Sequence, residues 1–254
     1  MSTRTNTELV AAVNDVLMTT WSLARDLTEA DAALPTDCPG WTVRDQLAHM
    51  VGLEQVLEGA PQPDVELPPL DYVKNDFAAM MERQVHIRRQ LPLVAICDEL
   101  DGLRRRRAET LAELVEQGDP DVEGPFGTRR LSQSLPIRVF DLWAHEQDIR
   151  RAVGLPVRDD CVAAEVALER ALLGWSKGLG KQLDGVDASV TVDVTGPTPR
   201  RERFDLGAGG PTVTISGSLG DITRAFCGRQ TRTISIDGPE ALVERITPAL
   251  GMTP

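Results

Sequence analysis

The sequence predicts an α+β protein, with a helical domain over residues 1–180 and a small α/β domain over residues 181–254. Two patterns support this prediction. Before about residue 180, apolar residues recur at intervals of three and four, as in helices that bury one face. After it, short runs of alternating β-branched residues such as ASVTVDVTG (188–196) are typical of strands. The 254 residues suffice for one large domain or two of ordinary size.

Composition limits the possible partners. Apolar residues make up 41% of the chain and charged residues 26%, which indicates a soluble globular protein. A net charge of −12 argues against nucleic acid or an anionic membrane surface as the main partner. The N-terminus has no apolar signal-like segment, and no run approaches a membrane span. The four cysteines form no CxxC pair, so we expect reduced, structural thiols in a cytoplasmic monomer or homodimer.

Two helices are expected first, over residues 7–27 and 42–58, separated by a turn-rich segment with Pro35, Pro39 and Gly40. Thr42 followed by Asp45 resembles a capping box at the start of the second helix. His49 lies on that helix, about 120° from the apolar position Val43, and is therefore expected at the border between its buried and wet faces.

Two further helical regions are expected over residues 71–90 and 93–117, on either side of Pro92, and a loop over 118–127. His86 lies in the first region and is interpreted as structural, because no ligand-type side chain follows it at a suitable spacing. The basic run LRRRRAE (103–109) is predicted to pair with neighbouring acidic residues on a solvated helix face.

The next helix is expected to begin near Ser134 as its cap, with Pro136 in the first turn, and to end near Gly154. It carries IRVFDLWAHEQDIR (137–150), in which Asp141, His145 and Asp148 share one face. A helix over 159–178 precedes the second domain. There we expect strands over 188–196, 210–218 and 232–239 and helices over 218–227 and 239–250.

The chain contains three histidines, so an imidazole-based site has few possible compositions. We expect His49, Asp141 and His145 to meet as a three-ligand metal site with an open position, because facing helices can present ligands to one point. Two histidines and a carboxylate suit zinc, although non-haem iron uses similar ligands. Asp148 could orient His145 or bind the metal itself. Alternatively, the histidines are structural and bind no metal.

The segment CPGWTVRDQLAHMVGLE (38–54) and the DxxxHxxD pattern of the 141–148 helix resemble the mycothiol-dependent maleylpyruvate isomerase family of the DinB-like superfamily. GSLGDITRAFCGRQTRTISIDGPEALVERI resembles the small C-terminal domain of these enzymes. The resemblance implies a DinB-like four-helix bundle followed by a sterol-carrier-protein-like domain. It also implies a divalent metal, generally zinc, on His49, Asp141 and His145. Many members have Glu where this chain has Asp141, so its helix must approach the metal more closely or bind it through a bridging water.

The resemblance further implies mycothiol, a low-molecular-weight thiol, as cosubstrate. A metal lowers a thiol's pKa, which would allow cis–trans isomerisation of an unsaturated acid such as maleylpyruvate, or S-transfer to an electrophile. An acidic substrate needs a nearby cation, for which Arg224 and Arg229 are the expected catalytic residues and Arg44 and Arg138 further options. A non-catalytic regulator that binds a metal or small molecule on the same fold is the alternative.

Overall fold

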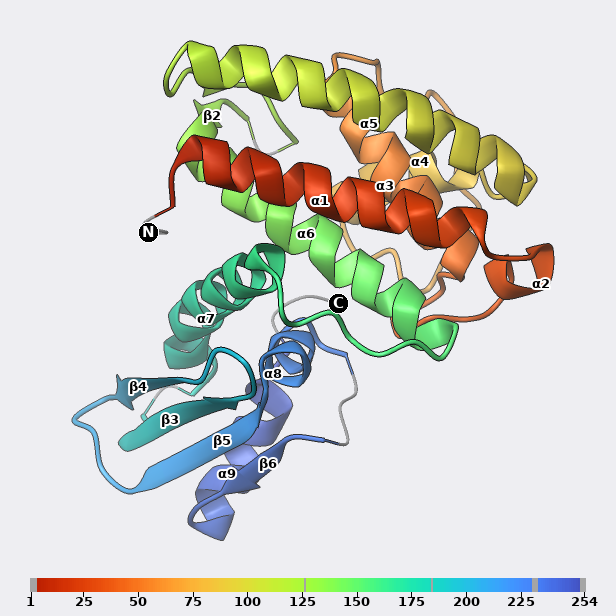
Figure 1. The fold of residues 1–254 in the computed structure, drawn as a ribbon. Helices are drawn as coiled ribbons and strands as arrows, with labels where there is room; N and C mark the ends of the chain where they lie inside the picture. The colour runs from red at the N-terminus through yellow and green to blue at the C-terminus, as the bar shows by residue number, and fades with distance from the viewer. Residues whose placement is uncertain (1–3, 126, 184, 230–232, 252–254) are drawn as a thin grey trace. The chain divides into compact units, whose positions relative to one another are not determined.

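A computed structural model describes residues 4–125, 127–183, 185–229 and 233–251. The chain divides into two compact units, Met1–Pro156 and Val157–Pro254. The first is built mainly from helices and the second combines helices with a four-stranded sheet, which confirms the α+β class (Figure 1). In the part of the chain described, no helix is long and apolar enough to cross a membrane.

Unit 1 is a bundle of long helices whose apolar stripes face one another. Helix α1 packs against α5 and α6, and α3 packs against α4, α5 and α6 (Figure 1). The elements of unit 1 are α1 (Asn6–Arg25), α2 (Glu29–Ala32), α3 (Val43–Leu57), α4 (Asp76–His86), α5 (Leu93–Glu116), β1 (Asp121–Val122), β2 (Arg129–Arg130) and α6 (Leu131–Ala152).

The start of α3 follows the predicted capping box. The Thr42 side chain accepts a hydrogen bond from the Asp45 backbone N–H, and the Asp45 carboxylate accepts one from the Thr42 N–H. Pro92 separates two helices as expected, and it occupies the N-cap position of α5. These local signals determine where α3 and α5 begin.

The predicted start of α6 is wrong. The helix begins at Leu131 rather than after Ser134, and Pro136 lies inside it. The segment expected to be a loop forms one strand of the antiparallel hairpin β1–β2, which leads directly into α6. The Asp119 carboxylate accepts hydrogen bonds from the backbone N–H and the hydroxyl of Ser132, so this side chain supports the first turn.

Unit 2 contains a sheet of strand order β4-β3-β5-β6, in which β3 and β5 are parallel and the other pairs antiparallel. Helix α8 packs against α7, β3 and β5. The predicted boundary at residue 180 falls within α7, whereas the compact units divide before α7 because α7 packs on α8. Strand β4 has the sequence RRERFDL, which is mostly charged and gave no clear strand pattern. The elements are α7 (Val162–Gln182), β3 (Ala188–Thr195), β4 (Arg200–Leu206), β5 (Thr212–Ser218), α8 (Leu219–Phe226), β6 (Ser235–Asp237), α9 (Glu240–Ile246) and a 3₁₀ turn (Thr247–Ala249).

Candidate metal centre

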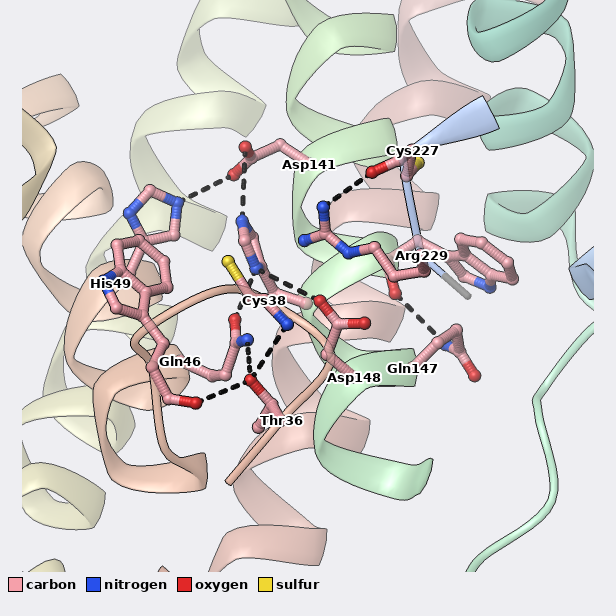
Figure 2. A network of polar contacts seen from close by, with 12 residues as sticks. Thr36, Cys38, Gln46, His49, Asp141, Gln147, Asp148, Cys227 and Arg229 are labelled. Atoms are coloured by element: carbon pink, nitrogen blue, oxygen red, sulfur yellow. Dashed lines mark hydrogen bonds and ion pairs between the residues drawn. The ribbon is translucent and has the colours of Figure 1, made fainter. Parts of the chain in front are cut away.

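Three side chains from two helices of unit 1 converge as expected. His49 comes from α3 and Asp141 from α6 (Figure 2), and His145 also comes from α6. Each offers one ligand-type atom within 4.8 Å of the others. Nε2 of His49 lies 3.4 Å from Oδ2 of Asp141, and Nε2 of His145 lies 3.6 Å from Oδ1. Asp141 and His145 are one helical turn apart, while the packing of α3 on α6 brings in His49.

The two imidazole–carboxylate separations, 3.4 and 3.6 Å, match those expected around a metal ion. Nitrogen and oxygen ligands about 2.1 Å from a tetrahedral ion lie roughly 3.4 Å from one another. The short side chain of Asp141 reaches both imidazoles, so it closes the cluster without the additional methylene of a Glu. The residues present therefore fit a divalent ion held by two imidazoles and one carboxylate.

Both histidines are buried, with only 3% of His49 and 8% of His145 exposed. The expected border position of His49 is therefore wrong. The indole of Trp41 explains this, because its centroid lies 5.0 Å from the His49 ring and 5.8 Å from the His145 ring. The two imidazoles are 4.5 Å apart and meet edge to face. The cluster thus lies in a partly apolar environment that limits access of water.

Trp41 is held by a polar network of its own. Its indole N–H donates to Glu82, which also accepts a hydrogen bond from the Tyr72 hydroxyl and pairs with Arg89. Gly40 makes room for this arrangement: its φ is +78°, and a Cβ there would lie 2.3 Å from the Tyr72 ring. The sequence pattern identified the turn but gave no sign of this support.

A chain of alternating charges leads away from Asp141 into the bundle. Arg138 donates to Oδ2 of Asp141 at 2.6 Å and pairs with Glu54, whose other oxygen lies 2.5 Å from Arg107. Arg107 also pairs with Glu58. Arg107 belongs to the basic run that was expected on a solvated face. Two other members of that run, Arg104 and Arg105, do pair with Asp101 as predicted, but Arg107 is buried.

These surroundings set the charge of the cluster. Burial by itself would raise the pKa of Asp141, but the guanidinium of Arg138 and the histidines outweigh it and hold that pKa well below its usual range. Burial, aided by His145, lowers the pKa of His49. At neutral pH the site therefore presents a carboxylate and an uncharged His49, the states that bind metals.

The partner of the second His145 nitrogen was not predicted. Nδ1 of His145 contacts Oε1 of Gln46, whereas Asp148, the expected orienting residue, lies 4.0 Å from the same nitrogen. Gln46 is on α3, so its contact with α6 depends on tertiary packing and leaves no spacing signal in the sequence.

Residues 14–150 match the family described as "Mycothiol maleylpyruvate isomerase N-terminal domain". This match spans more than half of the 254 residues and contains the whole His49–Asp141–His145 cluster. The chain belongs to this family.

Solved structures give a similar result for the fold. The crystal structure of the mycothiol-dependent maleylpyruvate isomerase is 17% identical, with a TM-score of 0.65 over 93% of this chain and 96% of that one. A histidine-to-alanine mutant of that enzyme has the same identity and coverage and a TM-score of 0.63. At this identity the likeness establishes the fold. No curated protein matches the sequence.

The remaining predicted residues lie outside the cluster or stay untested. His86 ends α4 and is not a member of the cluster. Arg44 pairs with Glu29 and with the Leu91 carbonyl, both in unit 1. Arg224 on α8 and Arg229, three residues after that helix ends, are buried in unit 2. Their role in catalysis remains a prediction.

Proposed function

We propose that this protein is a metal- and mycothiol-dependent isomerase that converts an unsaturated acid of the maleylpyruvate type between its cis and trans forms. The observation that carries the proposal is the His49–Asp141–His145 cluster, in which both imidazoles are buried and the carboxylate is half-buried, in a member of this family. We further propose that unit 1 is a DinB-like four-helix bundle and that unit 2 is a sterol-carrier-protein-like domain. The protein is proposed to be a cytoplasmic monomer or homodimer.

The cluster would hold a divalent ion, for which zinc is our choice. Two imidazoles, one carboxylate and an open position are the ligand set of many catalytic zinc sites. A bound ion would lower the pKa of an incoming thiol, so that thiolate is present at neutral pH. Asp141 supplies the negative charge of the ligand set, and Arg138 holds the orientation of that carboxylate.

The chemistry of the thiol is balanced without any other reagent. The thiolate sulfur bonds to one carbon of the electron-poor double bond, and the π electrons pass to the conjugated carbonyl as an enolate. The remaining single bond rotates, and the returning electron pair breaks the carbon–sulfur bond and releases the thiolate. If that bond persisted, the same site would perform S-transfer. Trp41 limits water around the imidazoles. We assign Arg224 and Arg229 the binding of the substrate carboxylates.

Metal analysis tests the site directly. We expect about one zinc per chain in protein purified without chelators and loss of that zinc in His145→Ala. His86→Ala is the matched control, because it removes a histidine outside the cluster. Sub-stoichiometric zinc that His145→Ala leaves unchanged would overturn the site.

The reaction requires a separate assay with mycothiol and a panel of electrophiles that includes maleylpyruvate. We expect isomerisation that disappears when the metal is removed and returns when zinc is restored. Zinc binding without metal-dependent isomerisation or thiol consumption across the panel would exclude the enzyme and favour a regulatory protein.

A further inference from the structure

We propose that Thr36 and Gln46 are positioning residues that fix the tautomer of His145, so that its Nε2 lone pair points toward Asp141. The order of the contacts is Trp41 carbonyl, Thr36 hydroxyl, Gln46 amide and His145 imidazole. Figure 2 shows the central contact, between Thr36 and Gln46. The purpose we assign to this relay rests on the proposed metal site, whereas the relay itself can be tested without a metal.

The relay begins at a carbonyl group, which can only accept hydrogen bonds. The Trp41 carbonyl oxygen lies 3.0 Å from the backbone nitrogen of Thr36 and 2.8 Å from its Oγ1. A carbonyl has no proton, so the Thr36 hydroxyl must donate its single hydrogen to it. The hydroxyl oxygen can then only accept further hydrogen bonds.

This requirement determines which way the side-chain amide of Gln46 is oriented. Oγ1 of Thr36 lies 2.8 Å from the Gln46 amide nitrogen and 3.3 Å from the backbone nitrogen of Cys38, and both are donors. A reversed amide would place its oxygen against an oxygen that has no hydrogen left to donate. The Gln46 nitrogen therefore faces Thr36, and its carbonyl oxygen faces His145.

The amide in turn fixes the imidazole. The Gln46 carbonyl oxygen accepts, so Nδ1 of His145 carries the proton and donates it. In a neutral imidazole the other nitrogen, Nε2, then bears a lone pair. That lone pair faces Oδ1 of Asp141 at 3.6 Å, an arrangement suited to two ligands of one cation and not to a direct hydrogen bond.

His49 lacks such support. Its buried Nδ1 has no hydrogen-bond partner among the described residues, while its Nε2 lies 3.4 Å from Asp141 and can donate to it. Binding a metal through Nε2 would require His49 to move its proton to Nδ1. The relay thus prepares one of the two histidines, and the second must change tautomer.

The test is the tautomer of His145 in metal-free protein, measured from its ¹⁵N chemical shifts and long-range ¹H–¹⁵N couplings. With three histidines in the chain, single His→Gln variants assign the signals. We expect Nδ1 to be protonated in the wild type and in Thr36→Ser, which keeps the hydroxyl. Thr36→Val and Gln46→Leu should show a substantial Nε2-protonated population. A wild-type His145 protonated at Nε2, or a Thr36→Val spectrum identical to the wild type, would overturn the relay.

Zinc titration measures the consequence. Loss of a group that orients a metal-bound histidine typically weakens metal binding by about 10–100-fold, which we expect for Thr36→Val and Gln46→Leu, with Thr36→Ser near the wild type. Far-UV circular dichroism checks that each variant folds. If Gln46→Leu unfolds, the comparison of Thr36→Val with Thr36→Ser is sufficient for the test. Equal zinc affinity in Thr36→Val and Thr36→Ser would overturn the positioning role. A wild type that binds no zinc but keeps the expected tautomer would overturn the proposed function alone.

Discussion

The interior of unit 1 and the sheet of unit 2 are stabilised in different ways. Around α3 and α6, unit 1 buries many ionisable side chains, whereas the paired strands β3 and β5 of unit 2 bury mainly β-branched apolar ones. Among the described residues of unit 1, the buried acidic, basic and histidine side chains are those of Asp45, His49, Glu54, Glu82, Arg88, Arg107, Arg138, His145, Glu146 and Asp148. The apolar ones on the two strands are Ala188, Val190, Val192, Val194, Val213 and Ile215.

The difference has an energetic consequence. Apolar burial stabilises in rough proportion to area, so each residue of the sheet contributes nearly independently. A buried charge is tolerated only while its partners remain, because removing one partner leaves another charge unpaired in a medium of low dielectric. Unit 1 should therefore be the more sensitive to conservative polar substitutions.

The largest effect is expected for Glu54→Gln. Glu54 is fully buried and pairs with Arg138 and Arg107 at once, so the substitution leaves two buried guanidinium groups without their shared carboxylate. We expect a loss of about 3–5 kcal/mol from the free energy of unfolding of unit 1. Urea denaturation followed by tryptophan fluorescence in a Trp175→Phe background measures it, because the other three tryptophans lie in unit 1.

Glu58→Gln is the matched control for this prediction. Its carboxylate pairs with Arg107 but is 18% exposed, so water can replace part of the lost contact. We expect a loss no greater than about 1 kcal/mol. Equal losses in the two variants would mean that the buried carboxylate is no more important than its exposed neighbour.

A smaller effect is expected when strain is introduced into each unit. Gly40 and Gly207 both have positive φ, and a Cβ would lie 2.3 Å from the Tyr72 ring or 2.1 Å from the Asp187 carboxylate. Alanine at either position should destabilise its unit by about 1–3 kcal/mol. Only Gly40→Ala should also weaken zinc binding, because Tyr72 and Trp41 share Glu82. Calorimetric zinc titration measures this difference. If Gly207→Ala weakens zinc binding as much as Gly40→Ala does, the effect is not specific to the support of Trp41.

The sequence predicted those parts of the fold that depend on local signals. The Thr42–Asp45 capping box, Pro92 and the alternating run at 188–196 each act over a few residues, and the corresponding elements appear where expected. The predicted start of α6 was wrong because Asp119 and the β1–β2 hairpin support the first turn from outside the helix. The spacing of apolar residues within a helix carries no information about such contacts from outside it.

The same distinction applies to the candidate site. Asp141 and His145 share a helix, so their spacing predicted their proximity, and the family resemblance supported the addition of His49. Gln46 and Thr36 were not predicted, since their contacts join segments about 100 and 10 residues apart through packing alone. Helical spacing predicts neighbours within an element, and only the tertiary structure identifies those across elements.

The smallest expected effect is a change in the pH dependence of stability within unit 1. Burial lowers the pKa of His49 below its usual value of 6.5, so between those two values the unfolded chain binds the proton that the folded protein excludes. The resulting stabilisation is complete above pH 6.5 and is lost as the pH falls toward the folded pKa, at no more than about 1.4 kcal/mol per pH unit. Urea denaturation of metal-free protein between pH 7.5 and 5.5 should show this slope in the wild type and in His86→Gln. It should be reduced in His49→Gln. Parallel profiles for His49→Gln and the wild type would mean that the buried imidazole accepts its proton as readily as the unfolded chain does. The interior of unit 1 would then tolerate an unpaired charge better than its many ion pairs suggest.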